Sequence, residues 1–78
     1  MCNVARDECN DDATCKAILE GWKTLCANLK GKKVKTCDAR CMGAGSMLRQ
    51  NILGSRAWQC LKGSNKTLKT RYFKLCLD

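Results

Sequence analysis

The 78-residue sequence contains no histidine and no proline, and only four of its residues are aromatic. Without histidine, the commonest general base of enzymes and the commonest metal ligand of proteins are both missing. The sequence also has no Cys-x-x-Cys motif, which a zinc domain would be expected to show. Alternating runs of β-branched and aromatic residues, the usual mark of strands, are missing as well. We therefore expect a helical protein that is not an enzyme and that holds no metal or organic cofactor.

Long apolar runs are absent too. No run approaches the roughly 20 apolar residues that a membrane-spanning helix requires. Internal repeats and low-complexity tracts are also missing, and the length suits one unit. We expect a single domain over residues 1–78, without membrane insertion.

Cysteine is the residue that the sequence has in excess, with eight among 78 residues. A domain this small buries too little apolar surface to be stable on a hydrophobic core alone, and small secreted domains compensate with disulfides. The even count allows every cysteine to pair, although 105 pairings are open for eight cysteines. The composition predicts a disulfide-stapled protein that is secreted or lies at the extracellular cell surface.

Acidic residues are few, and they gather at one end of the chain. The formal net charge is +8, yet residues 1–20 contain five acidic and two basic residues, whereas the remaining part contains two acidic and thirteen basic ones. Such a field favours acidic partners, for example sulfated glycans, anionic lipid or an acidic protein surface. The alternative is that the charge serves solubility alone. An oxidising location argues against nucleic acid as the partner.

Helical patterns account for the first half of the chain. We expect a short helix over residues 2–9, then a second helix that Asp11 or Asp12 caps and that Gly31 ends. Residues 30–36 form a basic loop without apolar periodicity. The second helix has apolar residues at spacings of three and four, namely Cys15, Ile18, Trp22, Leu25, Cys26 and Leu29.

The second half predicts two longer helices. One runs over residues 36–53 and ends at Gly54, and Gly43 and Gly45 within it indicate either a bend or a close approach of another backbone. Its apolar stripe consists of Cys37, Cys41, Ala44, Leu48 and Ile52, so that Cys37 and Cys41 share a face and each pairs with a different neighbouring element.

The last helix runs over residues 64–76, with Ser64 or Asn65 as its cap, after a short turn or helix at Trp58. Trp22 is expected in the core, and Trp58 is the better candidate for exposure. The predicted fold class is a small all-α, disulfide-stapled bundle of about four to five helices.

The spacing Cys2-x6-Cys9-x5-Cys15-x10-Cys26 is similar to that of the domains of the glial-cell-line-derived neurotrophic factor (GDNF) receptor alpha family, which the growth-arrest-specific receptors share. Residues 9–16, CNDDATCK, resemble the family's CNLDDICK stretch. Cys37-x3-Cys41, followed by Ala44 and Leu48, resembles its Cys, Cys, Ala, Leu helix. The resemblance covers the whole chain, more closely as far as Cys26.

The family domain usually has ten cysteines, and two of them are missing here. Lys62 stands at the position of one, and the other is expected near Asn65. In the family these two cysteines bond each other, so the departure removes one whole bridge and leaves no unpaired thiol. The pairing that the resemblance implies for the rest is Cys2–Cys60, Cys9–Cys15, Cys26–Cys41 and Cys37–Cys76.

The resemblance also implies a function. In the family, the helix after the third cysteine and the last helix meet a dimeric cystine-knot growth factor. By position, Asn10 matches a contact residue and Lys69 keeps the positive charge of another. Leu19 and Lys23 occupy contact positions where the family has Arg and Ile, which predicts a different ligand or lost binding. Alternatively, all four are ordinary residues of helix surfaces.

Two further features suggest extracellular partners. Asn65-Lys66-Thr67 is a glycosylation sequon, which also arises by chance. Basic residues near the ligand face bind heparan sulfate in the family, and the resemblance together with the charge predicts polyanion binding here. The candidates are Lys30, Lys32, Lys33, Lys35, Lys66, Lys69 and Arg71.

The sequence thus favours an extracellular protein-binding module that recognises a growth-factor-like or receptor protein, with heparan sulfate as a second partner. The alternative is a free-standing secreted effector, such as a toxin or pheromone, that uses the same scaffold to engage a cell-surface receptor or ion channel. A membrane-active helical protein of the saposin type is a third interpretation. Four bridges argue against it, since its helices would have to leave the core.

Overall fold

The computed structural model describes residues 2–31 and 34–77, and in this part of the chain all regular structure is helical. The prediction of a small all-α, disulfide-stapled bundle is confirmed. No helix among the described residues is long and apolar enough to cross a membrane. The elements are α1 (Cys2–Asp11), α2 (Ala13–Leu25), the 3-10 helix η1 (Ala27–Lys30), α3 (Ala39–Gln50), α4 (Ile52–Gln59) and α5 (Ser64–Cys76).

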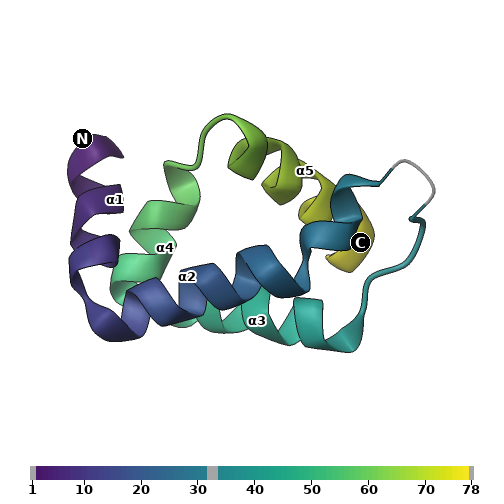
Figure 1. Ribbon diagram of the computed structural model, residues 1–78, viewed down its shortest axis with the longest axis horizontal. Coiled ribbons are helices and arrows are strands. Elements are labelled where there is room, and N and C mark those ends of the chain that lie inside the picture. The colour runs from purple at the N-terminus through teal and green to yellow at the C-terminus, as the bar shows by residue number, and fades with distance from the viewer. Residues whose placement is uncertain (1, 32–33, 78) are drawn as a thin grey trace.

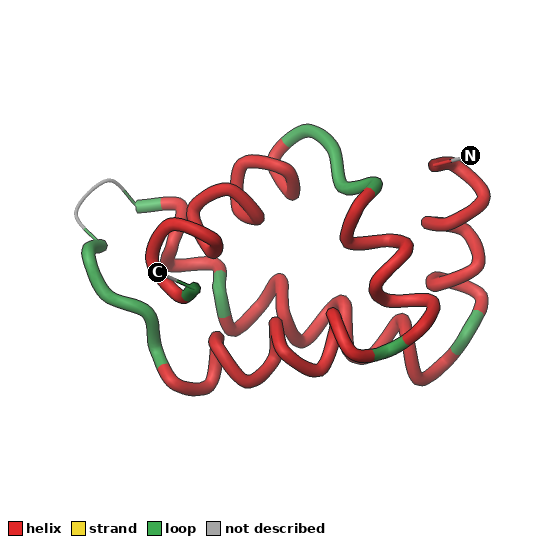
Figure 2. Tube along the Cα trace, turned by 180° about the vertical axis from the view of Figure 1, so that it is seen from behind, coloured by secondary structure: helices red, strands yellow, loops and turns green. Residues whose placement is uncertain are grey.

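The helices form an elongated bundle of 34 × 21 × 19 Å (Figure 1). α2 and α3 lie side by side along the long axis, while α1 and α4 pack against each other at one end. The chain then crosses back, and α5 packs against η1 at the other end, as the view from behind also shows (Figure 2). α1, α2 and the start of α5 border the same side of the molecule.

Asp12, rather than Asp11, begins the second helix. Its backbone is extended, and its carboxylate accepts a hydrogen bond of 2.8 Å from the Cys15 amide, the usual N-cap arrangement. The α-helix ends at Leu25, earlier than predicted, and η1 continues the chain to Gly31. The disulfide of Cys26 to α3 lies at this change of geometry.

The predicted helix over residues 36–53 is wrong at both ends. Asp38 caps α3 with a side-chain hydrogen bond to the Arg40 amide, so the helix starts later. Asn51 then ends α3, because its backbone is extended. Its side chain accepts a hydrogen bond of 2.9 Å from the Gly54 amide and so caps the start of α4. Gly54 therefore lies inside α4 and does not end a helix. The break also removes Ile52 from the apolar stripe and leaves it 75% exposed.

The last helix has the predicted bounds but not the predicted cap. Gly63 occupies the N-cap position with a φ of 61°, a left-handed conformation that glycine adopts readily, and no side chain caps this end. The assignment of Ser64 or Asn65 as the cap is wrong, since both already belong to the helix.

Aromatic side chains from three helices meet in the core. The Trp22 and Trp58 ring centroids lie 5.0 Å apart, and those of Trp58 and Tyr72 lie 5.4 Å apart, both edge to face. Trp22 is fully buried, as predicted, but Trp58 is only 5% exposed, so the prediction of its exposure is wrong. Trp58 lies four residues after the buried Gly54 and so on the same, inner face of α4. The prediction that a helix ends at Gly54 concealed this relation between the two positions.

Gly45 allows α3 and α5 to approach closely. A Cβ atom at this position would overlap the Tyr72 ring, whereas one at Gly43 would meet nothing. The Tyr72 hydroxyl of α5 donates a hydrogen bond of 3.1 Å to the Met42 carbonyl of α3, the helix that contains Gly45. Gly45 is therefore a site of close packing, although the neighbour is the Tyr72 side chain and not another backbone, as was predicted.

The four disulfides have the pairing that the resemblance implies. They tie α1 to the end of α4, α1 to α2, the end of α2 to α3, and the segment before α3 to the end of α5, so that each α-helix is anchored. Cys37 precedes α3, so it does not share a helical face with Cys41, although the two bond to different elements as expected. The bonds are Cys2–Cys60, Cys9–Cys15, Cys26–Cys41 and Cys37–Cys76.

Candidate functional site

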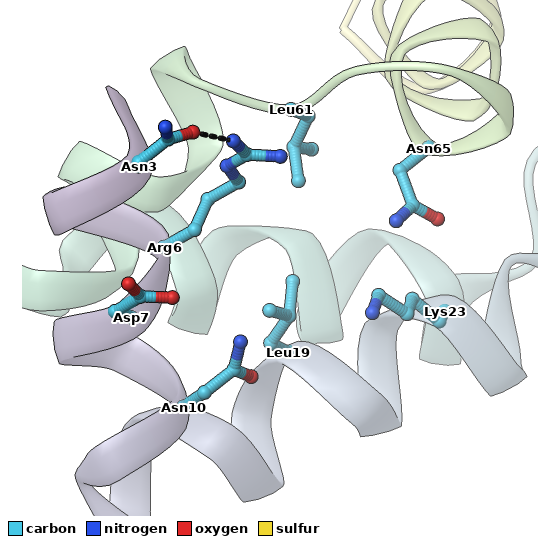
Figure 3. A pocket seen from close by; sticks show the side chains of 8 residues that line it. All are labelled: Asn3, Arg6, Asp7, Asn10, Leu19, Lys23, Leu61 and Asn65. Carbon is cyan, nitrogen blue, oxygen red and sulfur yellow. Dashed lines mark hydrogen bonds between the residues drawn. The ribbon is translucent and has the colours of Figure 1, made fainter. Parts of the chain in front are cut away.

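A cleft of about 440 Å³ opens between α1, α2 and the start of α5 (Figure 3). α1 forms one wall, α2 forms the base, and the α4–α5 connection with the first turn of α5 closes the far side. The cleft is lined by Asn3, Arg6, Asp7, Asn10, Leu19, Lys23, Leu61 and Asn65.

The α1 wall is polar because Asn3, Arg6, Asp7 and Asn10 recur at helical spacing and so share one face. The Asn3 side-chain oxygen accepts a hydrogen bond from the Arg6 guanidinium. The Arg6 Nε atom is buried and has no partner among the described residues. This wall therefore offers a guanidinium, a carboxylate and two amides to a ligand.

The base of the cleft is apolar at its centre. Leu19 is 4% exposed and Leu61 is also buried, so their side chains belong to the core and show only a small surface to the cleft. Lys23 lies one turn after Leu19 on α2, and its ammonium group is 3.4 Å from the Glu20 carboxylate. An exposed pair of this kind is worth little, about 0.3–0.5 kcal/mol, so Lys23 can readily turn to a ligand.

Three of the four ligand-binding candidates lie together in this cleft. Asn10, Leu19 and Lys23 all line it, whereas Lys69 does not. The Lys69 ammonium group lies 5.7 Å from the centre of the Trp58 ring of α4 and 6.0 Å from that of Phe73 of α5, which is a cation–π arrangement.

Sequence reasoning missed much of the cleft. Asn3, Arg6 and Asp7 carry a signal, because with Asn10 they form a polar face along residues 3–10 at spacings of three and four. Leu61 carries no such signal, because it follows α4 in an irregular connection.

No family model, curated protein or solved structure gave a significant match to the chain. The cleft combines two cationic side chains, one carboxylate and three amides around an apolar floor. Protein interfaces likewise have an apolar centre inside a polar rim, and arginine is enriched there.

The polyanion candidates differ in accessibility. Lys30, Lys35 and Lys66 are exposed, and Lys69 is half-buried. Arg71 is tied into the fold, because its guanidinium donates hydrogen bonds of 3.1 Å to the carbonyls of Leu29 and Val34.

Leu29 directly precedes the basic loop and Val34 lies within it, so Arg71 ties these two positions to α5. This fixes the place at which Lys30 and Lys35 are displayed. Lys32 and Lys33 lie outside the described residues.

The glycosylation candidate Asn65 is half-buried in the first turn of α5 and lines the cleft. Thr67, the third residue of the sequon, is exposed and does not line the cleft. Its hydroxyl lies 3.4 Å from the Gly63 carbonyl, to which it donates.

A second, apolar groove of about 280 Å³ lies between α2 and α3. The exposed side chains of Leu25 and Met47 contribute to it. Sequence reasoning assigned Leu25 to the core stripe and so did not identify this surface. The groove is lined by Ala17, Ile18, Gly21, Leu25, Ala44 and Met47.

Proposed function

We propose that the chain is an extracellular protein-binding module of the GDNF receptor alpha type, which recognises a growth-factor-like or receptor protein through the cleft between α1, α2 and α5. The observation that carries the proposal is the placement of Asn10, Leu19 and Lys23 around one cleft, since the resemblance marks these three positions as ligand contacts. Four disulfides suit an extracellular location.

The character of the cleft supports a protein as the ligand. Amide side chains can donate to and accept from main-chain groups, so Asn3, Asn10 and Asn65 suit the exposed backbone of a partner loop. Arg6 and Lys23 add positive charge, which favours a partner with acidic residues at the contact. The apolar floor of Leu19 and Leu61 is small, which fits one inserted apolar side chain.

The lysine residues of α2 provide a matched test of this surface. Lys23 lines the cleft, whereas Lys16 is exposed on the same helix outside it. Both Lys23→Glu and Lys16→Glu lower the net charge by two. When displayed extracellular domains are screened with the wild-type protein made in a host without N-glycosylation, we expect a partner whose affinity falls at least tenfold with Lys23→Glu, or about 1.4 kcal/mol, and less than twofold with Lys16→Glu.

Circular dichroism should show that both variants are folded. Partners that bind the two variants equally would contradict the cleft as the binding site. A partner that is an ion channel or a signalling receptor, with no growth-factor-like ligand among the hits, would favour the effector alternative.

We further propose that the same module binds heparan sulfate through the basic loop and the start of α5. Lys30, Lys35 and Lys66 are exposed and form no ion pair within the described part of the chain. Arg71 fixes the residues directly before Lys30 and Lys35, and so limits the entropy lost when a polyanion binds.

Heparin chromatography tests this second surface. The double variant Lys30→Gln/Lys35→Gln should elute at clearly lower salt than the wild-type protein, because binding of this kind weakens as salt screens the charges. The control is Lys16→Gln/Arg49→Gln, which has the same net charge and should elute close to the wild type. Equal shifts for the two variants would show ion exchange governed by net charge and would overturn the proposal.

A further inference from the structure

We propose that Asn65 carries an N-linked glycan and that this glycan covers the cleft, so that glycosylation decides whether the cleft is open to a partner. The effect of the glycan on partner binding rests on the proposed function. Whether the glycan covers the cleft does not depend on any partner. Two independent observations meet at this residue. The sequence Asn65-Lys66-Thr67 is a sequon, and the structure places Asn65 in the lining of the cleft.

The side chain of Asn65 is available for modification. It takes part in no hydrogen bond within the described part of the chain, so attachment of a sugar breaks no interaction of the fold. Figure 3 shows its amide pointing from α5 into the cleft, towards Lys23 on α2, with Asn10 on the opposite side. A sugar on this nitrogen therefore starts inside the cleft.

The transfer reaction is ordinary for a secreted chain. The Asn65 Nδ2 atom attacks C1 of an oligosaccharide carried on a polyprenyl diphosphate. The N–C1 bond forms, the bond between C1 and the phosphate oxygen breaks, the lipid diphosphate leaves with the electron pair, and the amide loses one proton to a base. Because Asn65 is helical and half-buried in the folded protein, the transfer takes place before α5 packs.

After folding, the glycan has to leave through the mouth of the cleft. A glycan is strongly hydrophilic and so cannot enter the apolar core. The buried Leu19 side chain forms the floor of the cleft on the α2 side and blocks that direction. Its first sugars therefore lie over the lining and separate Lys23 from solvent. Ligand contacts at Asn10 and Lys23 are lost for as long as the glycan is present.

Thr67 offers a way to control the glycan without altering the cleft. Thr67→Ser keeps the sequon and its hydroxyl, whereas Thr67→Ala removes the sequon, and the exposed position lies outside the cleft lining. The proteins are secreted from a eukaryotic cell, which supplies the lipid-linked oligosaccharide. Intact mass before and after treatment with peptide N-glycosidase then gives the occupancy of Asn65.

Competitive acetylation of lysines, followed by peptide mass spectrometry, reports whether the cleft is covered. We expect Lys23 to be acetylated at least threefold more slowly in the glycosylated wild-type and Thr67→Ser proteins than in Thr67→Ala. The acetylation rates of Lys16 and Lys35 should be unchanged and serve as internal references. Enzymatic removal of the glycan from the folded protein leaves aspartate at position 65, so the treated protein should react at Lys23 at the rate of an Asn65→Asp variant that never carried a glycan.

An unglycosylated wild-type protein, or a glycosylated one in which Lys23 reacts at the rate of Thr67→Ala, would overturn the inference. No ligand is used in these measurements. Failure of the cleft to bind any partner would therefore overturn the proposed function and leave this result intact, and the reverse also holds.

Discussion

Complete reduction of the four disulfides is expected to abolish the helical structure at 37 °C. Three of the bridges close segments of 58, 39 and 15 residues in sequence separation. In the chain-entropy model, each such closure removes about 3 to 4.5 kcal/mol of unfolded-state entropy. Their sum is comparable to the whole stability of a small domain, about 5–15 kcal/mol. Without the bridges, the core of this chain is too small to keep it folded.

Far-UV circular dichroism with a phosphine reductant measures this effect. Alkylation and mass spectrometry should show that all eight cysteines have reacted, and the oxidised protein at equal ionic strength is the control. A helical signal that persists in the fully alkylated chain would show that the packed helices are stable by themselves, against the stapled-core account.

Replacing Gly45 with alanine is expected to destabilise the protein, by about 3 kcal/mol, because the added Cβ would overlap the Tyr72 ring. Tyr72 lies in the centre of the aromatic core, so its ring cannot move without disturbing Trp22 and Trp58. A displaced ring would also lose the hydrogen bond from its hydroxyl to the Met42 carbonyl. Denaturant unfolding, with the transition midpoint compared at constant slope, measures the change.

Gly43 provides the matched control for this substitution. It lies two residues earlier on the same helix, is exposed, and has open space where a Cβ would lie. Gly43→Ala should therefore stabilise the protein by about 0.5–1 kcal/mol through helix propensity alone. A shift of both variants in the same direction would contradict the close approach of α3 and α5 at Gly45.

Much of the fold follows from local chemistry, and this is why the sequence predicted it. The apolar period of α5 agrees with its observed bounds, Ser64–Cys76, and the acidic pair before Cys15 supplied the cap of α2. The break at Asn51 was not predicted, because glycine is a common helix end and Gly54 stood where one was expected. Gly54 is there for another reason, since a Cβ would meet the Leu48 carbonyl where α3 and α4 join.

The candidate site was only partly accessible to sequence reasoning. Asn10, Leu19 and Lys23 came from the resemblance, and the structure brings them together in one cleft. Charge alone could not separate Arg71 from the exposed lysines, because its hydrogen bonds reach residues about 40 positions earlier in the chain. Contacts of this length depend on how helices dock, and a periodic pattern within one helix does not contain that information.

The aromatic core has an optical consequence. Trp22 comes from α2, Trp58 from α4 and Tyr72 from α5, and each pair of their rings lies within 6.2 Å, edge to face. Both indoles of the chain are buried in this cluster, so the tryptophan fluorescence and the tryptophan bands of the near-ultraviolet dichroism arise from the point where these three helices dock. The molecule therefore contains its own spectroscopic probe of tertiary packing, and no label has to be attached to follow it.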